Sequence, residues 1–127
     1  MGAKLLIIDD EADLVEALAL RFMASGFDVE TAPDGLAGLD RAHRRRPDVV
    51  LLDVAMPGMS GWDVCRRLKA DPETRGTPVL IMTAAMLRGS EEAARAAGAD
   101  GVVKKPFDDR GLVETVRGLV SRSAGAA

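Results

Sequence analysis

Three aspartates follow directly on short apolar runs of this sequence. Asp9 and Asp10 come after LLII, and Asp53 comes after VVLL. Carboxylates that lie side by side repel one another, and this repulsion raises their pKa values. A hard divalent cation relieves the repulsion, and Mg2+ fits best because it binds one or two carboxylates and retains water or phosphate oxygens. The three aspartates are therefore candidate metal ligands, provided that the fold brings them together.

A hydroxyl group and two ammonium groups follow other apolar runs. Thr83 ends VLIMT, and Lys104 and Lys105 follow the pair of valines at 102–103. Together with a metal ion, such groups can cover the charged oxygens of a phosphoryl group during its transfer. A carboxylate can accept that group as a nucleophile and form an acyl phosphate. Asp53 is the best candidate for this role, because it stands alone at the end of its run and precedes the loop MPGMSG.

The apolar runs are typical of strands in a parallel sheet. Four of them lack any alternation of apolar and polar residues, which indicates strands that are covered on both faces. The segment 27–32, FDVETA, does alternate and is expected at an edge of the sheet. The four continuous runs are LLII (5–8), VVLL (49–52), VLIM (79–82) and VV (102–103).

Segments with helical periodicity separate these strands. In 11–26 the apolar residues recur at helical spacing, and Gly26 is placed to end the helix. Ser90 is expected to cap a short helix that Gly98 closes. The remaining helices are expected at 34–46, at 60–71 with Trp62, Cys65 and Leu68 packed, and from Asp108 or Asp109 onward.

A strand followed by a helix therefore occurs five times. Right-handed crossovers place such helices on both faces of an open sheet. We expect an α/β fold with a doubly wound five-stranded parallel sheet. In such sheets the functional crevice lies beyond the carboxyl ends of the strands, so the candidate residues would meet at one edge.

Bulk properties restrict the class of protein. The 127 residues suffice for one domain, and the single cysteine excludes an intrachain disulfide or a cysteine metal cluster. The formal net charge of -3 argues against direct nucleic-acid binding. Apolar runs are too short to cross a membrane, and the N-terminus has no signal-peptide core, so we expect a cytoplasmic protein.

Basic residues cluster in RAHRRR, residues 41–46, directly before Pro47. The dipole of a helix that ends there favours cations, so we interpret the cluster as a solvated helix terminus and not as a phosphate-binding patch. His43 lies within it. We interpret this histidine as a solvent-facing residue, not as a phosphocarrier or a metal ligand.

The chain resembles the receiver domain of bacterial two-component response regulators. Four motifs carry the resemblance, in order and at the ends of the expected strands: LLIIDDE, LLDVAMPGMSG, LIMTA and AGADGVVKKPF. The resemblance implies the flavodoxin-like receiver fold with strand order 2-1-3-4-5. A receiver domain would then cover 1–121, and 122–127 would be a flexible C-terminal tail or the start of a linker.

The resemblance also implies a metal site. Asp53 is expected to be the phosphoacceptor and, with Asp10, a direct ligand of Mg2+. Asp9 would act on the metal through water, and the backbone carbonyl of Ala55 would complete the ligands that the protein supplies.

Phosphoryl binding is expected from Thr83 and Lys105. Lys105 and not Lys104 matches, because the lysine of this family immediately precedes a proline. The bond to Pro106 is expected to be cis, which would direct the lysine inward. Glu11 is expected to begin the first helix and not to bind metal.

Two features depart from the family pattern. Val102 stands where many receivers carry Tyr or Phe, so a switch that swings an aromatic ring inward cannot operate here. Ala55 and Ala85 occupy two positions that tune the lifetime of the phosphoryl group in this family. Both are small and apolar, and they do not predict that lifetime. We expect residues 84–98 to change most on phosphorylation, because their helix is mostly alanine and has little apolar bulk to anchor it.

The leading hypothesis is a phosphorylation-activated signalling switch with a histidine kinase or phosphotransfer protein as donor. It would not be an enzyme with turnover on a separate substrate. Its signal would pass to a downstream protein target or to an output domain missing from this chain, and residues 88–120 would form a docking face or a phosphorylation-dependent dimer.

Two alternatives remain. One is a phosphorylation-independent interaction module, and the other is a phosphatase, although Ala55 stands where such enzymes need a second aspartate.

Overall fold

The computed structural model of this 127-residue chain describes residues 2–84, 89–105 and 109–125. Three of the predictions made above therefore lie outside the described residues. They concern Ala85, the cis bond to Pro106 and the alternative helix start at Asp108.

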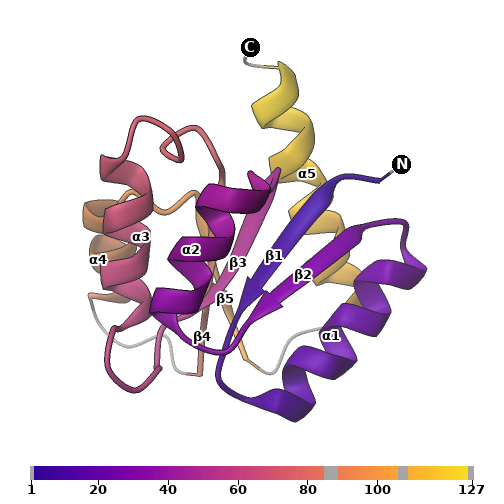
Figure 1. Ribbon diagram of the computed structural model, residues 1–127, viewed down its shortest axis with the longest axis horizontal. Coiled ribbons are helices and arrows are strands. Elements are labelled where there is room, and N and C mark those ends of the chain that lie inside the picture. Colours follow the sequence, from indigo (N-terminus) through magenta and orange to yellow (C-terminus); the bar gives the residue numbers. More distant parts are fainter. Residues whose placement is uncertain (1, 85–88, 106–108, 126–127) are drawn as a thin grey trace.

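The described residues form one five-stranded parallel sheet with the order β2-β1-β3-β4-β5. This order and the edge position of β2 confirm the predicted fold. Figure 1 shows the strands running side by side, with their carboxyl ends at the same edge of the sheet. The strands are β1 (Lys4–Ile8), β2 (Asp28–Ala32), β3 (Val49–Asp53), β4 (Val79–Thr83) and β5 (Gly101–Lys104).

Helices cover both faces of the sheet, with α1 and α5 on one face and α2, α3 and α4 on the other (Figure 1). In the described ranges, no helix is long and apolar enough to cross a membrane. The helices are α1 (Ala12–Ala24), α2 (Gly35–Arg45), α3 (Gly61–Ala70), α4 (Ser90–Ala97) and α5 (Asp109–Gly125).

The sheet separates two hydrophobic clusters. Leu5 and Ile7 of β1 pack with residues of α1 and α5, whereas Leu6 and Ile8 pack with residues of α2, α3 and α4. Successive side chains of a strand point to opposite faces, so a strand covered on both sides must be apolar throughout. This explains why the central strands read as continuous apolar runs.

Side-chain caps begin α2 and α3, and a glycine follows the end of α1. The Asp34 carboxylate accepts a hydrogen bond from Ala37 N at 2.8 Å, and the Ser60 hydroxyl accepts one from Asp63 N at 3.3 Å. Such bonds satisfy backbone N–H groups that the first helical turn leaves unpaired. After α1, Gly26 adopts a left-handed φ of 95°, as expected of a residue that ends a helix.

One predicted helix end is wrong. Ser90 is the first residue of α4 and not its cap; the N-cap position belongs to Gly89, whose φ of 91° changes the chain direction without a side-chain hydrogen bond. At the other end of the chain, α5 continues through residues 122–125, a segment for which we expected a flexible tail or the start of a linker. Neither a proline nor an earlier glycine cap stops α5 there, and the alanine in this segment favours a helix. The domain boundary at 121 itself stays a prediction.

The third helix packs as expected. Cys65 and Leu68 are buried in the cluster that also includes α2 and α4, and Trp62 is partly buried against the same cluster. Burial raises the pKa of the Cys65 thiol to about 11, so this thiol stays protonated at neutral pH.

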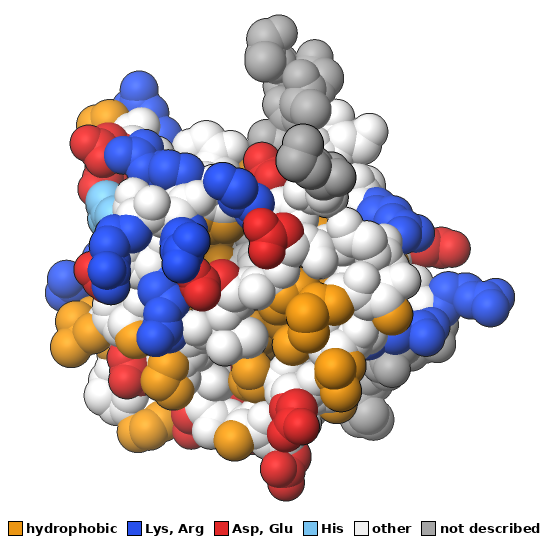
Figure 2. All heavy atoms as spheres, turned by 45° about the vertical axis from the view of Figure 1, so that its right-hand side comes forward, with side chains coloured by type: hydrophobic (Ala, Val, Ile, Leu, Met, Phe, Trp, Pro, Cys, Tyr) orange, Lys and Arg blue, Asp and Glu red, His pale blue; other side chains and the backbone are white. Residues whose placement is uncertain are grey.

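The basic end of α2 forms ion pairs with acidic neighbours. Arg44 pairs with Asp40, Arg45 pairs with Glu30, and Arg46 pairs with Glu73. Figure 2 shows basic side chains interspersed with acidic ones at the surface. These contacts fit a solvated helix terminus and give no support to a phosphate-binding patch.

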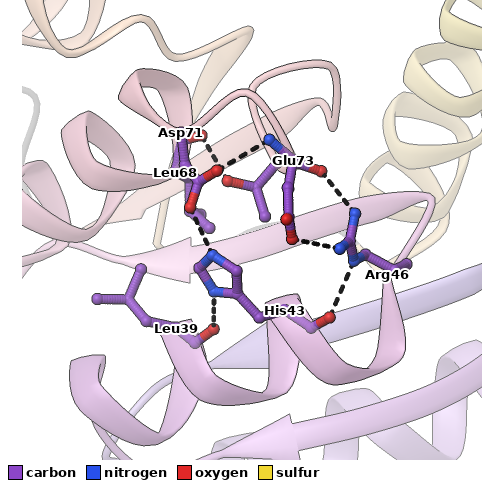
Figure 3. A network of polar contacts seen from close by, with 7 residues as sticks. Leu39, His43, Arg46, Leu68, Asp71 and Glu73 are labelled. Atoms are coloured by element: carbon purple, nitrogen blue, oxygen red, sulfur yellow. Dashed lines mark hydrogen bonds and ion pairs between the residues drawn. The ribbon is translucent and has the colours of Figure 1, made fainter.

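His43 is partly exposed, and its ring makes two polar contacts that were not predicted. Its ring lies between α2 and the segment after α3, where Nε2 is 2.6 Å from an Asp71 carboxylate oxygen and Nδ1 is 2.9 Å from the Leu39 carbonyl oxygen (Figure 3). The side chain is only 39% exposed. Sequence periodicity did not reveal this contact, because Asp71 lies 28 positions away in an irregular segment.

Candidate functional site

Three carboxylates meet at the carboxyl edge of the sheet. Asp9 and Asp10 follow β1, and Asp53 is the last residue of β3, the strand hydrogen-bonded to β1. Each aspartate offers one carboxylate oxygen, and these oxygens all lie within 4.8 Å of one another. Asp9 and Asp53 are buried, whereas Asp10 is exposed. The structure thus brings together the three aspartates that the sequence proposed as metal ligands.

Lys105 extends into this group of acids from the end of β5. Its Nζ atom lies 3.1 Å from Asp9 Oδ2, 3.0 Å from Glu11 Oε1 and 3.3 Å from Asp53 Oδ1. Its backbone N–H donates a 2.7 Å hydrogen bond to the carbonyl of Thr83, which fixes this residue against the end of β4. The preference for Lys105 over its exposed neighbour Lys104 agrees with this placement.

Sequence reasoning missed the contact between Glu11 and Lys105. Glu11 does begin the first helix, since it occupies the N-cap position of α1, and this was predicted. Its carboxylate, however, bridges to a residue 94 positions away. The only signal in the sequence was its position directly after the two aspartates, and that signal does not identify a partner.

The environment of Asp53 raises the pKa of its carboxyl group. Burial is the largest cause that raises the pKa of this carboxyl group, and the negative charge of Asp9 raises it further. The charge and hydrogen bond of Lys105, and a hydrogen bond from the backbone of Ala55, oppose the shift without cancelling it. A cation bound beside Asp53 would lower this pKa.

The surroundings of Lys105 favour the charged form of its ammonium group. Burial alone would lower the pKa of its ammonium group, because burial disfavours a charge. Hydrogen bonds to Glu11 and Asp9, together with the charges of Asp9 and Asp53, nevertheless raise the pKa above its ordinary value. Lys105 is therefore a permanent positive charge in this site.

The other residues predicted for the site are Thr83, Ala55 and Val102. Thr83 is buried at the end of β4, next to β3. Ala55 is exposed in the loop after Asp53, in which Met56 is buried, so Met56 serves packing. Val102 lies in β5 opposite Ile81 and packs, partly buried, against the cluster on the side of α2, α3 and α4.

A close backbone approach fixes the loop that follows Asp53. Gly61, the first residue of α3, donates its N–H to the carbonyl of Val54 at 2.9 Å. A Cβ atom at Gly61 would lie only 2.1 Å from the backbone oxygen of Asp53. Only glycine lets α3 begin so close to the end of β3, and this contact determines the path of residues 54–60.

Comparison with known families identifies the class of this protein. The family model described as the response regulator receiver domain matches residues 5–117. Because that match covers most of the 127 residues, the chain belongs to the response regulator receiver domain family. The family inferred from the four sequence motifs is confirmed.

Curated relatives of the chain are longer than the chain itself. Response regulator PleD of Caulobacter vibrioides is 44% identical over 119 residues, which cover 94% of this chain and 26% of PleD. DNA-binding response regulator MtrA of Mycobacterium tuberculosis is 38% identical over 123 residues, which cover 97% of this chain and 53% of MtrA. The chain thus spans about a quarter of one relative and about half of the other.

Solved structures share the fold over nearly their whole length. Chemotaxis protein CheY4 of Vibrio cholerae has a TM-score of 0.89 and 30% identity, with 94% of this chain and 99% of that chain covered. The receiver domain of sensor histidine kinase PA1611 from Pseudomonas aeruginosa has a TM-score of 0.87 and 25% identity, with 95% and 99% covered. The latter structure holds a magnesium ion in its active site cleft.

Proposed function

We propose that this receiver domain is a phosphorylation-activated switch that accepts a phosphoryl group on Asp53. The observation that carries the proposal is the position of Asp53. Its carboxylate is buried at the end of β3, grouped with Asp9 and Asp10, and 3.3 Å from the Lys105 ammonium group. A candidate nucleophile, a group of acids suited to a metal ion and a positive charge thus lie together at one edge of the sheet.

The donor set fits Mg2+. Its direct side-chain ligands would be carboxylate oxygens of Asp10 and Asp53, with nearby Asp9 acting through water, and a hard cation prefers oxygen. We propose that the backbone carbonyl of Ala55 adds a further ligand, as in the family that the motifs resemble. Repulsion from Asp9 is one cause of the raised pKa of Asp53, and a bound cation would relieve it. When bound, Mg2+ would neutralise charge on the acceptor and the phosphoryl oxygens.

The residues of the chain then have distinct tasks. An Asp53 carboxylate oxygen attacks the phosphorus atom of a phosphohistidine donor, the phosphorus–nitrogen bond breaks, and the donor histidine keeps the electron pair. Lys105 offers its ammonium group to the phosphoryl oxygens, and Thr83 offers its hydroxyl.

The product is the phosphorylated domain itself, which carries the signal. No separate product is released, in contrast to enzymatic turnover. Phosphorylation adds about -1.5 to -2 charges at neutral pH, which biases the arrangement of the surrounding segments. We propose a histidine kinase or phosphotransfer protein as donor, and a protein target or a linked output domain as receiver of the signal. A cytoplasmic location follows from such a donor.

Intact-mass analysis tests the acceptor directly. The protein is incubated with Mg2+ and acetyl phosphate, beside an Asp53→Asn variant and a sample without Mg2+. We expect one phosphoryl group on the wild type and none in either control. An adduct that persists in the Asp53→Asn variant would place the acceptor elsewhere and overturn the assignment.

A further inference from the structure

The Lys105 ammonium group is shared among three carboxylates. An ammonium group has three N–H donors and no acceptor. Asp9, Glu11 and Asp53 each place one oxygen between 3.0 and 3.3 Å from Nζ. The donors of Lys105 are thus matched one to one by acidic acceptors before any phosphoryl group arrives.

Glu11 reaches Lys105 because its side chain does not cap its own helix. It occupies the N-cap position of α1 with extended backbone angles, and its carboxylate makes no capping hydrogen bond. Serine, threonine, asparagine and aspartate are the usual caps, since their short side chains reach the first N–H groups. The longer glutamate side chain spans instead from the start of α1 to the end of β5.

The backbone of Glu11 is itself part of the acidic site. Its N–H donates a 3.0 Å hydrogen bond to Asp9 Oδ1, while Asp9 Oδ2 is held by Lys105. Glu11 therefore contacts the site twice, because its backbone N–H donates to Asp9 and its carboxylate accepts from the Lys105 ammonium group. Its side chain is placed by the same backbone that places Asp9.

The three acceptors differ sharply in exposure to solvent. The Glu11 side chain is 62% exposed, whereas those of Asp9 and Asp53 are 0% and 5% exposed. A phosphoryl group on Asp53 brings oxygens that need a donor from Lys105, so one present acceptor must release its donor. Water can replace Lys105 at the exposed Glu11 carboxylate most easily, because an unpaired buried carboxylate is costly.

We propose that Glu11 is a positioning residue that competes with the phosphoryl group for Lys105. In the unphosphorylated protein it draws the ammonium group toward the start of α1, and it must release that group when Asp53 is modified. Glu11 thereby weakens the binding of a phosphoryl group at this site. This inference rests on the proposed function, and it concerns a residue outside the metal ligands and the acceptor.

Beryllofluoride, which imitates a phosphoryl group on a carboxylate, is a suitable probe. Its Kd is measured by NMR titration at saturating Mg2+ for the wild type and for Glu11→Gln, which keeps the shape of the side chain and removes its charge. We expect the Kd of Glu11→Gln to be about two- to fivefold lower, the range of an exposed ion pair. Glu11→Asp, which keeps the charge on a shorter side chain, should show a similar decrease.

Asp13→Asn supplies the matched control. Asp13 is exposed in the first turn of the same helix, so this variant removes an equal charge without the contact to Lys105. We expect it to change the Kd less than Glu11→Gln does. In a Lys105→Met background, Glu11→Gln and Asp13→Asn should have equal effects. Thermal midpoints of all variants show whether each one folds.

Three results would overturn the inference: an increased Kd for Glu11→Gln, a change no larger than that of Asp13→Asn, or an undiminished effect without Lys105. A wild type that binds beryllofluoride while Glu11→Gln binds no more tightly would refute only the role of Glu11. A wild type that binds no beryllofluoride and forms no adduct on Asp53 would instead refute the proposed function, and the inference with it.

Discussion

At the scale of single residues, each ionisable side chain of the site depends on the others. Burial and Asp9 raise the pKa of Asp53, while Lys105 opposes that shift. The hydrogen bonds of Lys105 to Glu11 and Asp9 counteract its own burial. A change in any one of these side chains therefore alters the charge state preferred by its neighbours.

A second group of ionisable residues lies outside the site, at the end of α2. His43 has an acceptor at each ring nitrogen, namely the carboxylate of Asp71 and the carbonyl of Leu39 (Figure 3). Both nitrogens can donate only when the imidazole is protonated. The hydrogen bond to Asp71, followed by that to Leu39, raises the pKa of His43, and the same bond to His43 lowers the pKa of Asp71.

The contact of His43 predicts a pH-dependent stability. A raised histidine pKa contributes stability that is fully present below the unfolded pKa of 6.5 and is lost as pH rises through the higher folded value. We expect the free energy of unfolding to fall from about pH 6 to about pH 9, and to fall less in His43→Gln. Urea denaturation at both pH values measures the difference.

Arg44→Gln is the control for this experiment. Arg44 lies next to His43 on α2 and pairs with Asp40, not with Asp71. Its pH dependence should match that of the wild type. Equal pH dependence in the wild type and His43→Gln would contradict the predicted coupling.

At the scale of elements, the contact between β3 and α3 positions the phosphoacceptor. Gly61→Ala would place a methyl group 2.1 Å from the Asp53 backbone oxygen, so α3 would have to shift. We expect this variant to lose about 1–3 kcal/mol of stability and to be phosphorylated more slowly. Chemical denaturation and the rate of adduct formation measure the two effects.

Gly76→Ala is the matched variant, because a Cβ atom there meets nothing within 4 Å. It should fold and be phosphorylated like the wild type. If Gly61→Ala behaved in the same way, the close approach would have no influence on the position of Asp53.

The helix α4 is the element that we expect to respond most to phosphorylation. Of its eight residues, only Ala94 and Ala97 are buried, so little apolar surface holds it against the sheet. Amide exchange with and without beryllofluoride should change more in residues 90–98 than in α1 or α3. A uniform exchange profile across the helices would exclude this response.

The sequence predicted which elements form more reliably than where they end. Apolar runs and helical periodicity located each strand and helix, because burial on two faces or on one stripe imposes these patterns. The start of α4 depended on the backbone of Gly89, and the contact of Glu11 with Lys105 depended on side chains 94 positions apart. Local sequence patterns contain no information about such distant partners.

At the scale of the whole molecule, the two hydrophobic clusters support an edge that accumulates negative charge. The carboxylates of Asp9, Asp10 and Asp53 meet there, and Lys105, the residue after β5, provides a compensating positive charge. The fold therefore holds together charges that would separate in the unfolded chain, and this proximity limits its stability. A cation that binds only the folded state should reduce this cost.

Addition of Mg2+ should consequently stabilise the protein. Binding to the folded state contributes about 2.7 kcal/mol when the free ion concentration is 100 times its Kd. We expect a rise in the thermal midpoint that is lost in Asp10→Asn and retained in Asp13→Asn. An equal rise in both variants would show that Mg2+ acts away from the three aspartates.

The direction of α5 determines where the protein can be tethered to a surface. The strands run parallel and α5 returns along them, so β1 begins and α5 ends at the side of the sheet opposite to Asp53 (Figure 1). A strand of five residues separates the two sides by roughly 16 Å. A tether joined to either terminus would therefore leave the reactive edge open to solution. The immobilised protein would suit sensor measurements in which a large phosphodonor must approach Asp53 freely.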